Sequence, residues 1–269
     1  MCATEPMHCD RALKLVAMGR SPNPRQNHLL AALHTDDYAQ LLPDLELIRM
    51  PLGASVYERG VPMQHVYFPT TCMVSLLYVM KNGDSAEIAV TGNDGLVGVS
   101  VFMGGDGMSS RAVVQNAGDC YRVKASALNR EFALGGSLQF LVLRFTQALI
   151  AQMVQTGACN RHHTLEQQLC RWLLLTLDRM PGRRMTMTQQ LIGNMLGVRR
   201  AGVIEATGKL QKVGVLRYSG GNIVVRDRPK LEKRACECYA VVKKEIKRLF
   251  AYDLPARPRA KLKLVVSNR

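Results

Sequence analysis

The chain has 269 residues, of which 47% are hydrophobic and 21% charged, with a net charge of +15. This composition is typical of a soluble globular protein, and the length suffices for two domains with separate cores. We expect no secretory signal, because acids, Pro and Gly interrupt the first 26 residues. We expect no transmembrane helix, because no apolar run approaches ~18 uncharged residues. Eight cysteines then indicate free thiols in a reducing cytoplasm rather than a disulfide framework.

The positive charge is confined to one half of the sequence. Residues 1–158 contain 12 Lys and Arg against 13 Asp and Glu, a balance of −1, whereas residues 159–269 contain 24 against 8, a balance of +16. A neutral half followed by a basic half is typical of a sensor or scaffold joined to a nucleic-acid binder. An acidic membrane surface or an acidic protein partner would fit the same asymmetry.

A β-roll domain is predicted at residues 26–135, after a flexible N-terminus at residues 1–25. Its lead-in, residues 26–50, has apolar residues at helical spacing, with Pro43 as a break. Short runs rich in Val, Tyr, Leu and Ile then alternate with turns, which is typical of a β-sandwich or jelly roll. The pair Asn82-Gly83 predicts a tight hairpin with positive φ at both residues. The predicted strands are His65–Pro69, Met73–Met80, Ala86–Val90, Arg111–Gln115 and Cys120–Val123.

A long helix is predicted from Ser137 to about Thr156, within a central segment at residues 136–160, because apolar residues there recur every three or four positions. From periodicity alone this stripe fits a core face and a dimer seam equally well. A second helix, from Leu165 to about Asp178, carries the only tryptophan, Trp172, which we interpret as a core anchor. The stripe of the long helix comprises Phe140, Leu141, Leu143, Phe145, Ala148, Leu149, Gln152 and Met153.

Residues 161–252 are predicted to contain a winged helix-turn-helix. Thr188 can cap a helix over residues 189–196, and Gly197 can end it in the left-handed conformation. A second helix over residues 199–213 follows this short turn, as in DNA-binding helix pairs. Two short strands, at residues 215–218 and 223–226, flank Ser219-Gly220-Gly221-Asn222 and form the wing. The basic tail at residues 253–269 contains two prolines and is expected to be disordered.

This order of parts resembles the Crp/Fnr family of bacterial transcription regulators over about residues 30 to 250. The resemblance implies an α+β fold: an N-terminal β jelly-roll of the cyclic-nucleotide-binding-like type, a long central dimerisation helix and a C-terminal winged helix-turn-helix. It also implies a homodimer on a palindromic promoter site, which favours the dimer seam. The resemblance is carried by Tyr57-Glu58-Arg59-Gly60, Val66-Tyr67-Phe68-Pro69, the turns from Gly92 to Gly98, Arg171-Trp172-Leu173-Leu174, Thr188-Gln189, Met195-Leu196-Gly197-Val198-Arg199-Arg200 and the segment Leu231–Tyr239.

By position, the resemblance implies phosphate contacts at the start of the first helix and one base-reading Arg in the second. Arg200 falls on that Arg, which can donate two hydrogen bonds to guanine. Ala201 stands where a Glu is common and Glu205 where a second Arg is usual, so we expect a different operator. The predicted DNA-binding residues are Thr188, Gln189, Gln190, Arg199, Arg200, Ala201, Gly202, Glu205, Lys209 and Arg217.

The ligand pocket departs further from the family pattern. In the cyclic-AMP binders a Gly-Glu-Leu turn holds the ribose, but this chain has Gly98-Val99-Ser100 and no carboxylate there. Ser110 stands at the position of the phosphate-binding Arg, and Arg111 follows one residue later. Because successive side chains of a strand point to opposite faces, we expect Arg111 to point away from the pocket. We therefore expect no cyclic AMP, no other defined cofactor and an effector still to be identified, if there is one.

Few of the cysteines and histidines have the spacing that is typical of metal ligands. Cys2, Cys9, Cys72 and Cys120 lack the tight spacing of an iron–sulfur site, so we expect no cluster. Cys236 and Cys238, placed on one helix, would point their thiols to different faces, one in the core and one exposed. Cys159 near His162-His163 could bind a metal or respond to oxidants, but we favour a structural role and predict no metal site.

The sequence therefore predicts a cytoplasmic, homodimeric, sequence-specific DNA-binding transcription regulator and not an enzyme. Its expected partners are double-stranded promoter DNA and a second copy of the chain, with RNA polymerase as a further candidate and no membrane. Two alternatives stay open: a non-specific architectural DNA-binding protein with a vestigial sensor domain, and a redox- or ligand-sensing module.

Overall fold

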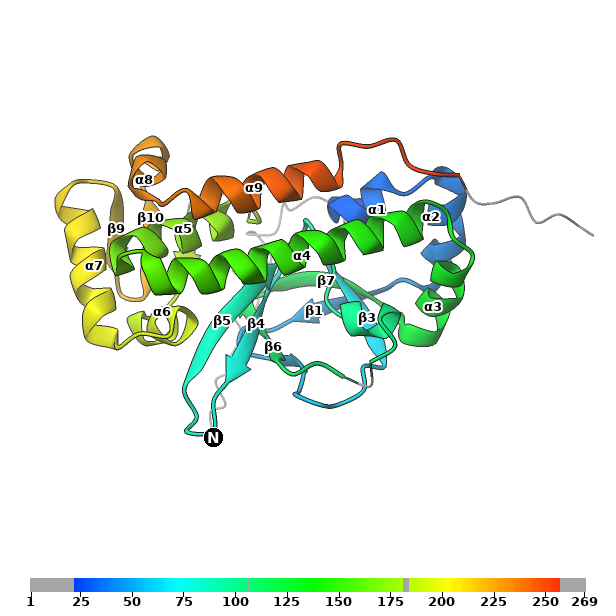
Figure 1. Cartoon of the computed structure of the whole chain (residues 1–269), viewed down its shortest axis with the longest axis horizontal. Helices are drawn as coiled ribbons and strands as arrows, with labels where there is room; N and C mark the ends of the chain where they lie inside the picture. The colour runs from blue at the N-terminus through cyan, green and yellow to red at the C-terminus, as the bar shows by residue number, and fades with distance from the viewer. Residues whose placement is uncertain (1–21, 106, 181–183, 257–269) are drawn as a thin grey trace, which may run out of the picture.

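The structure is a computed structural model that describes residues 22–105, 107–180 and 184–256. A β-rich part lies against one side of a long helix, and a helix-rich part lies at one end of it (Figure 1). The chain begins with short helices, η1 (Pro24–Gln26), α1 (His28–Ala32), α2 (Thr35–Leu41) and η2 (Leu42–Asp44). Most of the predicted flexible N-terminus and basic tail, residues 1–21 and 257–269, lies outside the described residues.

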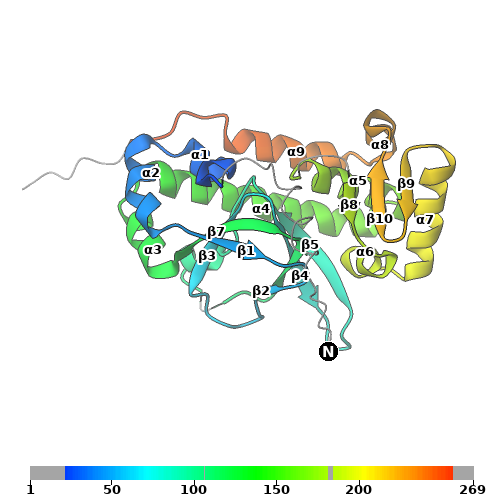
Figure 2. The same ribbon diagram turned by 180° about the vertical axis from the view of Figure 1, so that it is seen from behind.

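The β-rich part is a roll of two antiparallel sheets. One has the strand order β1-β7-β3 and the other β2-β6-β4-β5. Seen from behind, the β1-β7-β3 sheet lies in front of the long helix (Figure 2). The strands are β1 (Glu46–Met50), β2 (Ser55–Tyr57), β3 (His65–Pro69), β4 (Met73–Val79), β5 (Ser85–Thr91), β6 (Arg111–Asn116) and β7 (Gly118–Lys124), with the turn η3 (Val99–Phe102) between β5 and β6.

The five predicted strands are confirmed, and the structure corrects two other expectations. Residues 46–50 form β1 rather than helix, because their backbone pairs with β7. The β4–β5 hairpin exists, but Asn82 has no positive φ; only Gly83 does, at 89°. The loop is wider than a two-residue turn, and Met80 N donates to Asp84 O across it at 2.7 Å.

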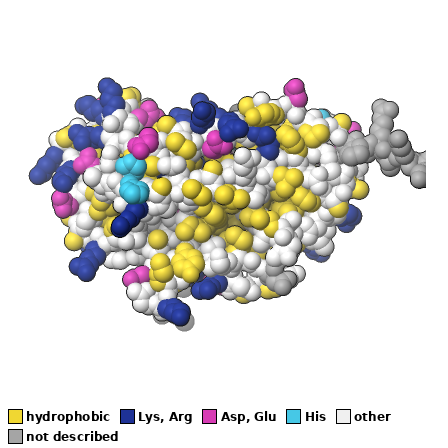
Figure 3. Space-filling model, viewed as in Figure 1, with side chains coloured by type: hydrophobic (Ala, Val, Ile, Leu, Met, Phe, Trp, Pro, Cys, Tyr) yellow, Lys and Arg dark blue, Asp and Glu magenta, His cyan; other side chains and the backbone are white. Residues whose placement is uncertain are grey.

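The long helix is α4 (Gly136–His162), which follows α3 (Ala125–Ala133) and extends six residues beyond the predicted end. Its inner face packs on the roll: Phe145, Leu149 and Gln152 are buried. The predicted stripe therefore falls mostly in the core. Leu143 of the stripe is instead 56% exposed, and it lies outside with Ile150 (52% exposed) and Val154 (67% exposed), which were not in the stripe. Apolar side chains gather over the middle of this face (Figure 3).

By length and composition α4 is the one helix among the described residues that could cross a membrane. In the structure it is a central packing element instead, lying against β5 on one side and α9 on another. Nearly half of its most apolar stretch, 44%, is buried within the protein.

The helix-rich part forms around α5 (Leu165–Leu177), whose Trp172 is 2% exposed and anchors the core as predicted. A three-stranded sheet has the order β8-β10-β9, and its edge strand β8 was not predicted. The elements are β8 (Arg184–Thr186), α6 (Gln189–Leu196), α7 (Arg200–Lys212), β9 (Leu216–Ser219), β10 (Asn222–Val225), α8 (Arg228–Arg234) and α9 (Cys238–Leu249). α9 runs back along α4 (Figure 1), and its last residue, Leu249, is buried in the core of the roll.

Two buried polar contacts join the roll to the helix-rich part. Trp172 Nε1 donates to Glu87 on β5 at 3.1 Å. Arg179, just after α5, forms an ion pair with Asp94 at 2.8 Å and donates to Gln152 of α4 at 3.0 Å. Burial raises the pKa of Glu87 to about 7, so this carboxyl changes its charge near neutral pH.

Candidate nucleic-acid interface

A helix-turn-helix is formed by α6 and α7, with Gly197 to Arg199 as the turn. The Thr188 hydroxyl accepts from Leu191 N at 3.2 Å and caps α6, as predicted. Gly197 has φ 66°, a left-handed conformation that favours glycine. Sequence analysis missed Gly193, where a Cβ would lie 2.8 Å from Val198 O. Both glycines are therefore needed for the tight turn that sets the angle between the helices.

α7 turns one face into the domain core and the other outward. Val203, Ala206, Thr207 and Leu210 are buried. The exposed side chains are Arg200, Ala201, Ile204, Glu205, Lys209, Gln211 and Lys212. Sequence analysis did not single out Ile204, which is 46% exposed in the outward face. The sequence could have identified Ile204, because it is an apolar residue that does not belong to the buried face of α7. Such an exposed side chain can contact a thymine methyl group.

Glu205 and Lys209 form an ion pair along α7, with Lys209 Nζ 2.8 Å from Glu205 Oε1. The hydrogen bond from Lys209 lowers the pKa of the Glu205 carboxyl. Both side chains border a 230 Å³ cavity shared with the start of α5 at Thr164 and Glu166. Lys209 occupies one oxygen of the Glu205 carboxylate, and the other oxygen can still accept a hydrogen bond.

The first turns of α6 and α7 and the tip of the wing enclose a groove of 510 Å³. Its lining brings four predicted residues together: Thr188, Gln189, Gln190, Arg200, joined by Tyr218, Gly220 and Gly221. The wing is fixed to the helices, because Tyr218 OH donates to Met187 O at 3.2 Å and Gln211 of α7 accepts from Tyr218 N. Backbone N–H groups at the start of a helix favour an anion, so this groove can hold phosphate.

The remaining predicted residues lie around this groove. Arg217 is exposed on β9 of the wing. Gly202 faces the protein, because a Cβ there would lie 2.8 Å from Leu165 on α5. Ala201 is exposed at the start of the outward face of α7. Lys and Arg side chains gather at the end of the molecule formed by α7 (Figure 3).

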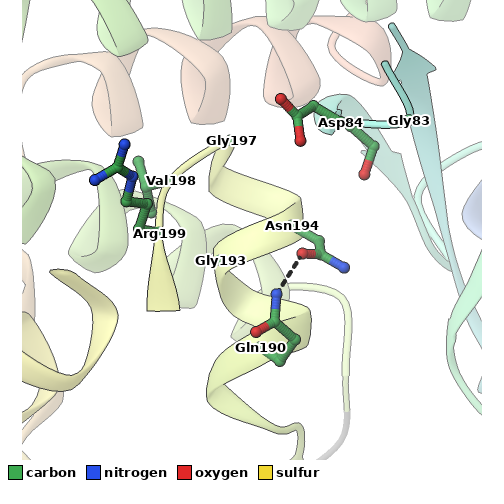
Figure 4. A pocket seen from close by; sticks show the side chains of 9 residues that line it. Gly83, Asp84, Gln190, Gly193, Asn194, Gly197, Val198 and Arg199 are labelled. Atoms are coloured by element: carbon green, nitrogen blue, oxygen red, sulfur yellow. Dashed lines mark hydrogen bonds between the residues drawn. The ribbon is translucent and has the colours of Figure 1, made fainter. Parts of the chain in front are cut away.

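Arg199 lines a separate cleft, of 480 Å³, between the β4–β5 hairpin and the helix-turn-helix (Figure 4). Gly83 and Asp84 of the hairpin lie on one side of the cleft, and Gln190 and Asn194 of α6 on the other. Contact is close at Gly197, where a Cβ would lie 3.2 Å from Ala86 Cβ. The sheet of the roll therefore touches the turn that orients α7.

Comparison with known proteins agrees with this geometry. Residues 167–234 match the family model described as the Crp-like helix-turn-helix domain. The fold resembles FixK2 from Bradyrhizobium japonicum (TM-score 0.61, 20% identity, 71% of this chain and 98% of that one). It also resembles a Crp/Fnr-family transcriptional regulator from Thermus thermophilus (0.55, 18%, 71% and 98%) and the c-di-GMP responsive regulator CLP from Xanthomonas campestris (0.55, 16%, 72% and 100%). No curated protein is significantly similar in sequence.

Residues 167–234 form a Crp-like helix-turn-helix domain, and the fold of the chain resembles that of Crp/Fnr regulators. The predicted fold class is thereby confirmed: β-rich sheets, a long central helix and a Crp-type helix-turn-helix.

The predicted ligand residues lie in different surroundings in this fold. Gly98 has φ 123° and precedes the turn η3, where Val99 and Ser100 are buried. Ser110 is buried and its hydroxyl lies 3.1 Å from Tyr57 OH. Arg111 instead forms an ion pair with Glu58 at 3.1 Å on the opposite, outer side. Apolar side chains of the roll core, including Val97, Val99 and Tyr57, pack together in the interior.

In this chain, a cluster of cysteines lies at the end of α4. The expectation that Cys236 and Cys238 share a helix is wrong: α8 ends at Arg234 and α9 begins at Cys238. Both thiols are buried, and both lie with Cys159 and His163 in one group. Burial raises the pKa of Cys159 to about 12. Of the other cysteines, Cys72 and Cys120 are buried together in the roll, whereas Cys2 and Cys9 lie outside the described residues.

Proposed function

We propose that the chain is a homodimeric, sequence-specific DNA-binding transcription regulator controlled through its β-roll, and not by cyclic AMP. The observation that carries the proposal is the groove in which Thr188, Gln189, Gln190 and Arg200 meet the wing. This groove lies in the basic half of the chain and within a Crp-like helix-turn-helix.

In this proposal, α6 binds the phosphate backbone and α7 enters the major groove. Gln189 and Gln190 lie in the first turn of α6, where free N–H groups attract phosphate. Arg200 reads guanine, and a good bidentate contact discriminates by about 1–3 kcal/mol. Ala201 and Ile204 contribute only apolar contacts, so much of the specificity comes from the shape and bending of the operator.

The exposed face of α4 supports a dimer. Leu143, Gln147, Ile150 and Val154 are exposed at alternating spacings of four and three residues, the pattern of a two-helix seam. Three of these four side chains are large and apolar, and a contiguous exposed apolar patch commonly marks an interface. Pairing α4 with its copy presents two α7 helices to one face of DNA, and a palindromic site with half-sites about 34–36 Å apart would match them.

Contacts between the roll and the helix-turn-helix support control of DNA binding by the roll. The β4–β5 hairpin touches the turn at Gly197, and Glu87 accepts from Trp172. A ligand that moved β4 and β5 would therefore change the position of α7. Ser110 and Arg111 do not form the phosphate site of the cyclic-AMP binders, which supports a different effector or none. RNA polymerase stays a predicted partner.

Selection of bound DNA from a random pool tests this proposal. We expect enrichment of a palindrome by the wild-type protein. Arg200→Ala should weaken discrimination at one base pair of each half-site by about 10- to 100-fold. Arg49→Ala, which removes an 81%-exposed Arg on β1, is the matched control and should leave the site unchanged. No enriched sequence would favour a non-specific architectural role, and an unchanged site for Arg200→Ala would contradict the assignment of α7.

A further inference from the structure

Four metal-binding side chains meet where the end of α4 contacts the junction between α8 and α9. Cys159, His163, Cys236 and Cys238 each direct one ligand atom inward, and all four atoms lie within 4.8 Å of one another. The three cysteines are buried and His163 is half-buried. A site closed to solvent on most sides, with three sulfurs and one nitrogen, is typical of structural zinc.

Local backbone geometry explains how distant residues converge. Cys159 lies in the last turn of α4, and His163 is the residue that directly follows the helix; His163 N donates to Cys159 O at 3.0 Å, which keeps the two residues together. The chain leaves α8 in extended conformation at Ala235, which places Cys236 outside any helix. Cys238 then starts α9, two residues on. Both thiols can therefore turn toward α4, which would be impossible on one continuous helix.

Two of the six ligand–ligand separations are close to those around a single tetrahedral ion, and all six are within 4.8 Å, so a small inward shift of the side chains would complete the site. Zn–S bonds of about 2.3 Å and Zn–N bonds of about 2.0–2.1 Å imply S···S distances near 3.8 Å and S···N distances near 3.6 Å. Here Cys159 Sγ lies 3.5 Å from Cys236 Sγ, and Cys238 Sγ lies 3.4 Å from His163 Nδ1. An iron–sulfur cluster spreads its ligands over several irons and needs a wider set. Calcium and magnesium require oxygen ligands.

Neighbouring groups supply the outer contacts that metal sites need. His163 Nε2 lies 3.2 Å from Glu237 Oε1, so a neutral imidazole can donate there and leave the Nδ1 lone pair facing the thiols. Gln155 Nε2 donates to Cys238 Sγ at 3.0 Å, which stabilises a thiolate. Ligating His residues almost always have such a carboxylate or carbonyl partner.

We propose that Cys159, His163, Cys236 and Cys238 bind one Zn²⁺ ion. The ion ties the last turn of α4 to the start of α9, the helix that returns along α4 and ends in the core of the roll at Leu249. It thereby fixes the central helix relative to the DNA-binding part. The site needs neither DNA nor an effector of the roll, so the zinc proposal can fail while the proposed function holds, and the reverse.

The test is metal content and cobalt spectroscopy of the full chain, purified without a histidine tag under reducing conditions. We expect one zinc per chain by elemental analysis. Co²⁺ added to the metal-stripped protein should produce thiolate-to-cobalt charge-transfer bands and the strong d–d bands of a tetrahedral site, saturating at one equivalent. Chelation should lower the melting temperature, because a ligand that binds the folded state stabilises it.

Substitutions of single residues test which side chains bind the ion. Cys236→Ser and His163→Ala should each lose the stoichiometric zinc, and Glu237→Ala should bind it about tenfold more weakly. Cys170→Ala is the matched control, since Cys170 is a buried cysteine of α5 outside the cluster, and it should keep the zinc. Absence of zinc and of cobalt bands in the wild-type chain would overturn the proposal, whether or not the variants fold. A Cys159–Cys236 disulfide in place of bound metal would also overturn it.

Discussion

Replacing Glu87 by glutamine should remove a pH dependence from the stability of the chain. Glu87 lies on β5, 7% exposed, between the Ser75 hydroxyl at 2.6 Å and Trp172 Nε1 at 3.1 Å. Burial raises its pKa from 4.5 to about 7. Since the folded pKa exceeds the unfolded one, the folded state binds this proton more tightly. The associated stability is fully present below about pH 4.5 and is lost as pH rises through about 7. The difference between the two pKa values corresponds to about 3 kcal/mol.

Urea unfolding at pH 5 and pH 8 measures this effect. At pH 5 the Glu87→Gln variant should lie within about 1 kcal/mol of the wild type in free energy of unfolding, because Glu87 is mostly neutral in the folded state and its unfolded pKa of 4.5 is only just below this pH. At pH 8 the variant should be more stable than the wild type, by up to about 3 kcal/mol. Glu58→Gln, a surface substitution with the same change of charge, is the control. Equal differences between variant and wild type at both pH values would refute the reasoning. Trp172, the only tryptophan, reports the same titration by its fluorescence.

Further substitutions test the packing of the parts and the dimer seam. Arg179→Met should cost about 3–5 kcal/mol in urea unfolding, because it leaves Asp94 buried without its partner; a loss under ~1 kcal/mol would contradict this. Gly95→Ala should cost about 1–3 kcal/mol in thermal unfolding, since its methyl group would lie 2.0 Å from Phe145. Gly208→Ala in α7, with nothing within 4 Å, should instead gain up to about 1 kcal/mol; the opposite order would disprove the packing argument. Ile150→Asp should give a monomer in light scattering, while Val61→Asp should not; a dimer in both would place the seam elsewhere.

The helix-turn-helix could be predicted to within a residue because its signals are local. Thr188 caps α6 and Gly197 ends it, and both act on backbone groups within four residues. The strands of the roll were found for a similar reason, since turn residues separate short apolar runs. The exposed side of α4 was not separable from its buried side, because both carry Leu and Val.

Features that depend on contacts between residues far apart in the chain could not be predicted from the sequence. β1 is a strand because β7, about 70 residues later, supplies its hydrogen bonds, and β8 exists because β10 does. The cysteine cluster depends on two facts that residue spacing does not reveal: α9 returns along α4, and the chain is extended at Ala235, just before Cys236. Gly193 and Ile204 are ordinary residues by type, and only the packing of α6 and α7 shows what each does.

Competition binding at fixed salt tests the central claim most directly. The full chain is bound to the palindrome selected from a random pool, and unlabelled competitors are added at physiological ionic strength. Our account predicts that the selected site competes at least about 10³-fold better than a shuffled sequence of the same composition. Equal competition by the shuffled DNA would contradict sequence-specific recognition by α7, because phosphate contacts alone do not distinguish the two.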